Sequence, residues 1–245
     1  MQHLNRRQFL DRSLLAAGAL FALPRTGFSD IAPGVETVAA PLITGAERNA
    51  QPDIWAMEVN FKPVRMIQAD VANPKTGKTS REVVWYLAYR AMIRASSGIS
   101  DAGMPEDRPI FVPDFLFVVE SRRGIEKYED RILPAAQAAI NKRERIQYKN
   151  SVEIVAPLPK ITPDRSRVLK SLDGVAIWTG IDPDVVFFTI YMSGFSNGYK
   201  VEQGPNGEEV VMRRTLAQKF WRPGDRFDQH EEEIRLKDDP FWIYR

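Results

Sequence analysis

The side chains best suited to chemistry in this sequence are carboxylates. Asp182-Pro183-Asp184 forms one acidic cluster, and Asp225 and Asp228 form another after a Pro-Gly pair. Clustered carboxylates can hold calcium, and two carboxylates that face each other across a cleft can hydrolyse a glycosidic bond. Asp-Pro pairs are also common turn formers, and no spacing here matches a calcium-binding EF-hand loop. We therefore predict no metal site and no cofactor.

Other catalytic side chains are scarce. The sequence has no cysteine and two histidines, His3 and His230. His3 lies within the first 29 residues, which have the pattern of a signal segment, so only His230 is left for the rest of the chain. A Ser-His-Asp triad would have to use His230, and a zinc site built from several histidines cannot form within one chain. Residues 193–198 depart from the G-x-S-x-G pattern of a nucleophile elbow, and no helix pattern follows them, so we interpret them as a loop. These absences favour a protein that is not an enzyme, with a carboxylate-dependent hydrolase such as a glycosidase as the alternative.

Aromatic side chains are the first candidates for ligand contact, because an exposed ring can stack against a sugar. Trp85 and Tyr89 lie on the apolar face of a predicted strand and are expected to fill the core. Tyr86 and Tyr199 are the better candidates for exposure. We therefore predict Tyr86 and Tyr199 as ligand-binding residues.

Two arginines are the second candidates for ligand contact. Arg222 and Arg226 flank the turn Pro223-Gly224-Asp225, and guanidinium groups can bind an anionic partner through paired hydrogen bonds. In the competing interpretation this segment is a solvated loop whose arginines pair with neighbouring Asp and Glu side chains. Both interpretations stay open from the sequence alone.

The N-terminus has the pattern of an export signal. Arg6 and Arg7 precede Phe9 and Leu10, and an uncharged, mostly apolar run follows from Leu14 to Leu23. This pattern is typical of a twin-arginine signal. The run is shorter than the roughly 20 apolar residues of a membrane-spanning helix. We predict a periplasmic or otherwise exported protein, with the cleavage site and retention by an uncleaved signal left open.

Charge gives no indication of nucleic-acid binding. The chain has 34 basic and 32 acidic residues. Four of the basic residues but only one of the acidic residues lie in the first 29 positions, so the rest of the chain has no excess of positive charge. Nucleic-acid-binding proteins usually carry a clear excess of Lys and Arg.

Strand patterns dominate the rest of the sequence. Residues 82–93 alternate, with apolar side chains at the odd positions, and residues 63–71 precede them across a turn cluster, which predicts an antiparallel hairpin. A second hairpin is predicted for residues 200–203 and 208–212, because Gly204-Pro205-Asn206-Gly207 is a typical turn sequence.

One helix is predicted after Pro134, which suits a first helical position. Ala136 and Ile140 place an apolar stripe on that helix, which ends near Arg145. Many short strands and one helix favour a mainly β fold, an antiparallel immunoglobulin-like β-sandwich with one short helix. The predicted organisation is an export signal (1–29), a linker or extended arm (30–53) and a β-sandwich domain (54–245).

The chain resembles an uncharacterised family of twin-arginine-exported bacterial proteins. The resemblance covers most of the chain after residue 54 and rests on Trp85-Tyr86-Leu87, Asp182-Pro183-Asp184, Ser196-Asn197-Gly198-Tyr199 and Arg222-Pro223-Gly224-Asp225. It implies export but no assigned activity, so no catalytic residue carries over. Our hypothesis is an exported, non-enzymatic protein that binds a protein or glycan in the cell envelope. We expect no nucleic-acid partner and no membrane span beyond an uncleaved signal.

Overall fold

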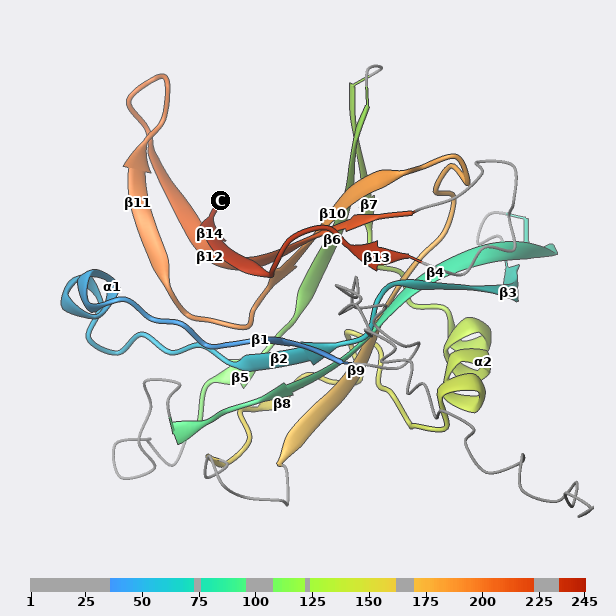
Figure 1. The fold of residues 1–245 in the computed structure, drawn as a ribbon, viewed down its shortest axis with the longest axis horizontal. Coiled ribbons are helices and arrows are strands. Elements are labelled where there is room, and N and C mark those ends of the chain that lie inside the picture. The colour runs from blue at the N-terminus through green and yellow to red at the C-terminus, as the bar shows by residue number, and fades with distance from the viewer. Residues whose placement is uncertain (1–35, 73–75, 96–107, 122–123, 162–169, 223–233) are drawn as a thin grey trace, which may run out of the picture. The chain divides into compact units, whose positions relative to one another are not determined.

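The computed structural model describes residues 36–72, 76–95, 108–121, 124–161, 170–222 and 234–245 (Figure 1). The export signal residues Arg6, Arg7, Phe9 and Leu10, and also Arg226, lie outside this set. The helices are α1 (Gly45–Ala50) and α2 (Pro134–Glu144), and the strands are β1 (Thr37–Ala39), β2 (Glu58–Phe61), β3 (Arg65–Ala72), β4 (Thr79–Met92), β5 (Ile110–Phe111), β6 (Asp114–Ser121), β7 (Gly124–Glu129), β8 (Ala156–Pro157), β9 (Ser171–Trp178), β10 (Phe187–Ser193), β11 (Tyr199–Gln203), β12 (Glu209–Trp221), β13 (Arg235–Leu236) and β14 (Phe241–Tyr244).

The first sheet is built around the long strand β4. β9 pairs with one edge of β4, and β2 and β3 pair one after the other with the opposite edge, while β1 extends the sheet beyond β2. Phe61 lies opposite Tyr89 and Arg65 lies opposite Tyr86. The β2–β3 side therefore carries one extra residue, which is a β-bulge around Pro63. A proline is tolerated there because a bulge interrupts the hydrogen-bonded ladder.

The second sheet is built around β12. On one side of β12 lie β10, β6 and β7 in that order, and β13 and β14 pair with its other edge. β11 pairs with Glu209–Arg213 at the start of β12, which confirms the predicted hairpin. The short strands β5 and β8 form a separate pair.

The facing sides of the two sheets enclose one apolar core. The alternation of β4 places Trp85, Leu87 and Tyr89 in this core, where Phe117 of β6 and Phe188 of β10 meet them from the second sheet. The Trp85 ring lies edge-on to both phenylalanines, with centroids 5.8 Å apart in each pair. Such pairs add about 0.5–1.5 kcal/mol each beyond their burial. The prediction that Trp85 and Tyr89 fill the core is confirmed.

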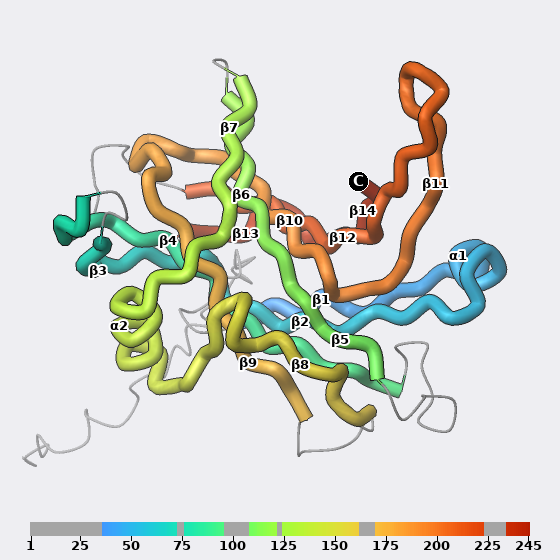
Figure 2. Tube along the Cα trace, turned by 180° about the vertical axis from the view of Figure 1, so that it is seen from behind, coloured from blue at the N-terminus to red at the C-terminus, as the bar shows by residue number. Residues whose placement is uncertain are grey.

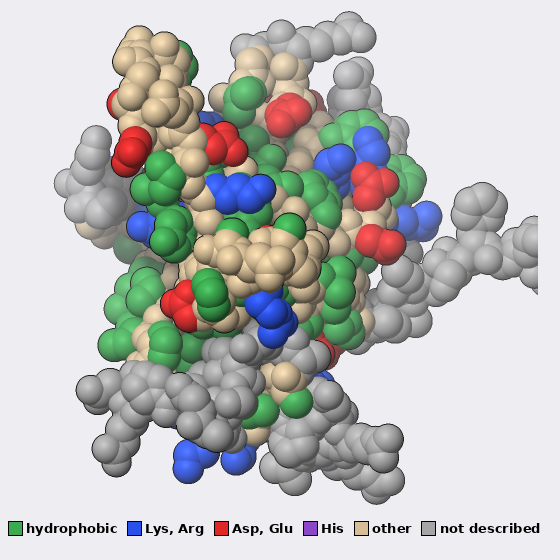
Figure 3. All heavy atoms as spheres, turned by 90° about the vertical axis from the view of Figure 1, so that its left-hand side faces the viewer, with side chains coloured by type: hydrophobic (Ala, Val, Ile, Leu, Met, Phe, Trp, Pro, Cys, Tyr) green, Lys and Arg blue, Asp and Glu red, His purple; other side chains and the backbone are tan. Residues whose placement is uncertain are grey.

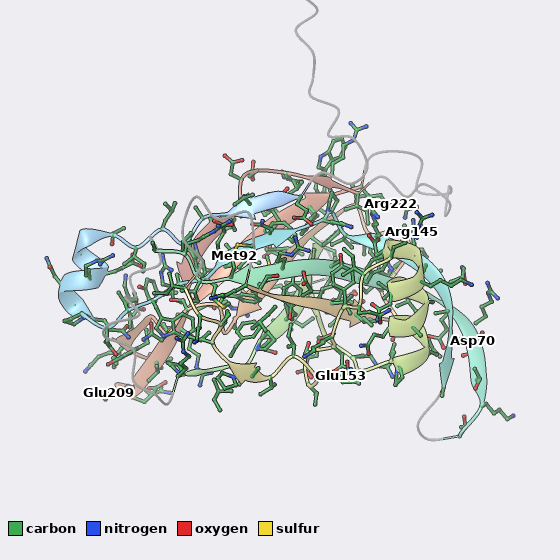
Figure 4. The ribbon with its side chains drawn as sticks, turned by 90° about the horizontal axis from the view of Figure 1, so that it is seen from below. Asp70, Met92, Arg145, Glu153, Glu209 and Arg222 are labelled. Atoms are coloured by element: carbon green, nitrogen blue, oxygen red, sulfur yellow. The ribbon has the colours of Figure 1, made fainter. Side chains whose placement is uncertain are left out.

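Helix α2 covers the other face of the first sheet. Ala136 and Ile140 are fully buried against that face, as their spacing predicted. Arg145 caps the helix at its C-terminal end with a left-handed backbone conformation, φ 58°. Figure 4 shows α2, with Arg145 labelled, alongside the first sheet.

Tyr86 lies beneath this helix and is 1 % exposed, so its expected exposure is wrong. Its hydroxyl donates to Glu144 Oε1 at 2.7 Å, and Lys62 and Arg65 pair with the same carboxylate at 2.7 and 2.8 Å. Burial tends to raise the pKa of Glu144, but these hydrogen bonds and charges outweigh burial and lower it. The alternation of apolar and polar residues along β4 predicted one buried face, and it could not show that α2 also buries the other face, where Tyr86 lies.

The prediction of a mainly β protein with antiparallel sheets is confirmed, whereas its immunoglobulin-like arrangement is not. The described residues contain two helices rather than the one that was predicted. Part of the segment predicted as a linker or extended arm, residues 30–53, is folded: β1 pairs with β2, and α1 is a capped helix. The pattern that identifies α1 was therefore missed in the sequence.

Candidate binding groove

A groove between α1 and β11, which we call the α1–β11 groove, has the size of a ligand site. Its volume is about 620 Å³, within the range of about 300–1,000 Å³ typical of binding pockets. One wall is α1, the other is Tyr199 to Glu202 of β11, and Ile54 and Tyr244 also line it. Figure 3 shows the side of the molecule on which α1 and β11 lie, where hydrophobic side chains are interspersed with charged ones.

Helix α1 is short but has a complete capping box. The Glu47 backbone N–H donates to Thr44 Oγ1 at 3.1 Å, and the Thr44 backbone N–H donates back to Glu47 Oε2 at 2.8 Å. The Thr-x-x-Glu spacing is a known helix start signal. It was the signal in the sequence that could have predicted this wall of the groove.

Glu47 also fastens α1 to the second sheet. Its Oε1 accepts hydrogen bonds from Arg214 Nε at 2.9 Å and from the Tyr244 hydroxyl at 2.7 Å. Burial tends to raise the pKa of Glu47, but hydrogen bonds from Thr44, Tyr244 and Arg214 outweigh burial and lower the pKa to about 2. Burial and the neighbouring Glu47 raise the pKa of Tyr244 to about 12. One wall of the groove is therefore held by a carboxylate whose pKa is lowered by its hydrogen bonds.

The loop between β10 and β11 holds the floor of the groove. Asn197 Oδ1 accepts a hydrogen bond from the Trp55 backbone N–H at 2.7 Å, and Ser196 Oγ donates to the Trp55 carbonyl at 2.5 Å. Gln51 Nε2 donates to the Asn197 carbonyl at 3.2 Å. Ser196 thus has a structural partner, which agrees with the interpretation of residues 193–198 as a loop.

On the outer edge of β11, the backbone N–H and C=O groups of alternate residues point away from β12. Arg213 exchanges both of its backbone hydrogen bonds with Arg245, at 2.8 and 3.2 Å, on the far side of β12. Tyr199 lies opposite Arg213, so its N–H and C=O point away from β12, and by alternation those of Val201 do the same. The Tyr199 N–H donates to Gln51 Oε1 at 3.3 Å. Within the described part of the chain, the Val201 N–H and C=O have no partner.

Residues from both faces of β11 border the groove: Lys200 and Glu202 project on one side of the strand, and Tyr199 and Val201 on the other. Tyr199 and Val201 are 54 % and 52 % exposed. The Lys200 ammonium lies 4.3 Å from the centroid of the Tyr244 ring, and Glu202 follows on the same side of the strand. Tyr199 therefore borders the groove, whereas Tyr86 does not, and ligand binding by Tyr199 stays a prediction.

Arg222 is not part of the α1–β11 groove. It is 6 % exposed, its NH1 donates to the Pro183 carbonyl at 2.5 Å, and its backbone N–H donates to the Val186 carbonyl at 2.8 Å. Figure 4 labels Arg222 and Glu209, which lie beyond one end and at the other end of β12, on opposite sides of the view. Tyr199 and Arg222 are therefore not brought together, and Arg222 holds the loop that contains Pro183.

The acidic clusters show turn chemistry where the structure describes them. Asp182 Oδ1 accepts a hydrogen bond from the Asp184 backbone N–H at 2.9 Å, as in an Asp-initiated turn. Asp225 and Asp228 lie outside the described residues. Across the described ranges, no three His, Cys, Asp or Glu side chains lie close enough to hold a metal ion.

The glycosidase alternative needs a carboxyl group with a raised pKa to protonate the leaving group. Among the described residues, the acidic side chain with a raised pKa is Asp130, in which burial raises the pKa to about 6. Asp130 does not line the α1–β11 groove, and the groove carboxylate Glu47 has a lowered pKa. Neither Asp130 nor Glu47 therefore combines a raised pKa with a place in the groove.

Comparisons with protein-family models, with curated proteins and with solved structures found no match for this chain. The resemblance to a family of exported bacterial proteins therefore stays a prediction. In the part of the chain that the structure describes, no helix has both the length and the apolar character needed to cross a membrane.

Proposed function

We propose that this protein is an exported, non-enzymatic binding protein whose α1–β11 groove takes an extended segment of a cell-envelope protein. The segment adds to the sheet as a further strand next to β11. The observation that carries this proposal is the Val201 backbone, whose N–H and C=O point away from β12 at an unpaired strand edge beside the groove. Strand addition of this kind gives affinity through main-chain hydrogen bonds.

The walls of the groove favour a single extended strand. α1 lies across from β11, so the space beside the edge is bounded by a helix on its other side. Ile54 and Tyr199 offer apolar surface to alternate side chains of the segment, and Lys200 and Glu202 offer both charges. A polypeptide is favoured over a glycan in this groove, because the exposed groups are backbone donors and acceptors in strand register.

Replacement of Val201 by proline tests the mode of binding. Val201→Pro removes the outward N–H and places a ring at the edge, while the hydrogen bonds between β11 and β12 come from other residues. Peptides selected from a random displayed library on the full chain are the probe. We expect Val201→Pro to weaken their binding by at least about tenfold, measured by titration calorimetry.

Val201→Ala is the matched control, because it shortens the same side chain but keeps the N–H. We expect it to bind the selected peptides nearly as well as the native protein. Equal affinity of the native and Val201→Pro proteins, or failure to select any peptide, would exclude strand addition at β11.

Export is proposed from the N-terminal pattern, and replacement of Arg6 and Arg7 by lysine tests it. The twin-arginine route depends on the paired guanidinium groups. We expect the double variant to remain in the cytoplasm on cell fractionation, whereas Arg12→Lys, which alters a neighbouring arginine outside the pair, is exported normally. Unchanged delivery of the double variant would contradict this route.

The immunoglobulin-like arrangement of the β-sandwich also stays part of the proposal. Two antiparallel sheets that face each other across one apolar core support it.

A further inference from the structure

The second sheet carries cations over aromatic rings on the side that faces away from the core. Phe188, Ile190 and Met192 of β10 point into the core, so the alternate residues Phe187 and Tyr191 point outwards. We call this side of β10, β12, β13 and β14 the outer face. It lies apart from the edge of β11 that borders the groove.

Each of four rings on the outer face has a basic side chain over it. The cation-to-centroid distances are 4.0 Å for Arg245 over Tyr191, 4.6 Å for Lys237 over Phe187, 5.4 Å for Lys219 over Phe241 and 5.9 Å for Arg235 over Trp221. Contacts of this kind are worth about 0.5–1 kcal/mol at exposed sites. They hold the long side chains in place, so less side-chain entropy is lost when an anion binds them.

Strand register gathers these pairs into one patch. Tyr191 and Phe241 flank Ala217 from the two neighbouring strands, and Phe187 and Arg235 flank Trp221 in the same way. Two strand spacings separate the outer members of each row, about 10 Å. One acidic side chain lies among them: Asp238 is 3.6 Å from Lys219, with both side chains exposed.

A hollow at one end of the patch brings two of the cations together. It has a volume of about 330 Å³, and its lining includes Phe187, Lys219 and Lys237, with one acidic side chain, Glu120. Two ammonium groups beside a half-exposed ring suit an anionic group attached to an apolar or sugar ring.

The surroundings of the patch indicate a chain molecule rather than a flat surface. Figures 1 and 2 show the β11–β12 hairpin and the β6–β7 hairpin rising on the two sides of β14. Two projecting hairpins would keep a planar bilayer away from β14, which lies between them. A flexible polymer can lie across β14 between the hairpins.

From these observations we infer that the outer face binds an acidic polysaccharide, with carboxylate or sulfate groups held by Lys219, Lys237 and Arg245. Single-stranded nucleic acid fits less well, because base stacking needs an open ring face, and here each of the four rings has a cation over it. This site is independent of the groove proposed for a polypeptide segment.

Binding of polygalacturonate and dextran sulfate to the full chain, measured by titration calorimetry, tests the inference. We expect both polymers to bind, more weakly at high salt, and neutral dextran not to bind. The triple variant Lys219→Ala, Lys237→Ala and Arg245→Ala should lose at least about tenfold in affinity. Val201→Pro should leave this affinity unchanged, which separates this test from that of the groove.

A control variant with the same change in charge uses Lys78→Ala, Arg81→Ala and Lys149→Ala, which replace exposed residues outside the second sheet. It should bind acidic polysaccharide as the native protein does. An equal loss of affinity in both triple variants would show that only net charge matters and would overturn the inference. The inference would also be overturned if neither polygalacturonate nor dextran sulfate bound, or if oligo-dT bound more tightly than both of these polymers.

Discussion

Gly194→Ala should lower the free energy of unfolding by about 3–5 kcal/mol, the largest effect that we expect from a single substitution. Gly194 has φ +85°, a conformation that a residue with a Cβ adopts at a cost. A Cβ there would lie 2.1 Å from the Val112 carbonyl oxygen and 2.9 Å from its carbon, both backbone atoms. Because backbone atoms cannot rotate aside as a flexible side chain can, the loop after β10 would have to move.

That loop is the one that holds Trp55 and the floor of the α1–β11 groove, so its displacement should also weaken peptide binding. Gly207→Ala is the matched control. Gly207 has nearly the same φ, +83°, but a Cβ there meets nothing within 4 Å. We expect Gly207→Ala to cost only about 1–2 kcal/mol in urea unfolding, the conformational part of the effect. Equal losses in the two variants would show that the close approach to Val112 has no energetic weight.

Asp130→Asn should remove a pH dependence of stability worth about 3 kcal/mol. Asp130 follows β7 and reaches the first sheet: its Oδ1 accepts a hydrogen bond from the Ile177 backbone N–H at 2.6 Å, and its Oδ2 accepts one from the Ser151 hydroxyl. Burial raises its pKa to about 6, and the hydrogen bonds from Ser151, Ile177 and Arg131 do not offset this effect.

The direction of the effect follows from the proton balance. The folded protein holds the Asp130 proton more tightly than the unfolded chain, whose value is 3.8. Stability from this group is therefore present below about pH 4 and is lost as the pH rises through about 6. An asparagine keeps an oxygen for the Ile177 N–H and has no charge to bury at any pH.

Urea unfolding of the native and Asp130→Asn proteins at about pH 4 and about pH 7.5 measures this difference. We expect the native protein to lose up to about 3 kcal/mol more free energy of unfolding than Asp130→Asn when the pH is raised from about 4 to about 7.5. Asp70→Asn, which removes one exposed carboxylate at the β3–β4 hairpin, should follow the native protein. Parallel curves for the native and Asp130→Asn proteins would mean that Asp130 is not a buried, proton-binding group.

Much of the local structure could be predicted because the period of apolar residues reflects burial directly. The alternation around Trp85 identified a core strand, Ala136 and Ile140 identified the buried side of α2, and Gly204 to Gly207 identified the β11–β12 turn. The bulge at Pro63 was not predictable, since it depends on which strand pairs with which edge of β4. The burial of Tyr86 beneath α2 was also missed, because it depends on which face of the sheet the helix packs against.

Less of the candidate sites could be predicted, because they depend on long-range register. Tyr199 was identified as an exposed ring, but the groove beside it needs α1, whose Thr44 and Glu47 signal was overlooked. The ring–cation pairs join residues such as Tyr191 and Arg245, which are far apart in sequence and are brought together by the pairing of both β10 and β14 with β12. Neither residue has a pattern around it that indicates the other.

The contact between the two ends of the described chain has a consequence for how the protein folds. Trp242 Nε1 donates to the Ala40 carbonyl at 3.0 Å, across 202 positions of sequence, and Tyr244 reaches Glu47 across 197. A nascent chain cannot complete these contacts until β14 has left the ribosome. Contacts between residues so far apart in sequence form slowly, so β1 and α1 can complete their local contacts, with β2 and within the capping box, well before they dock against β14.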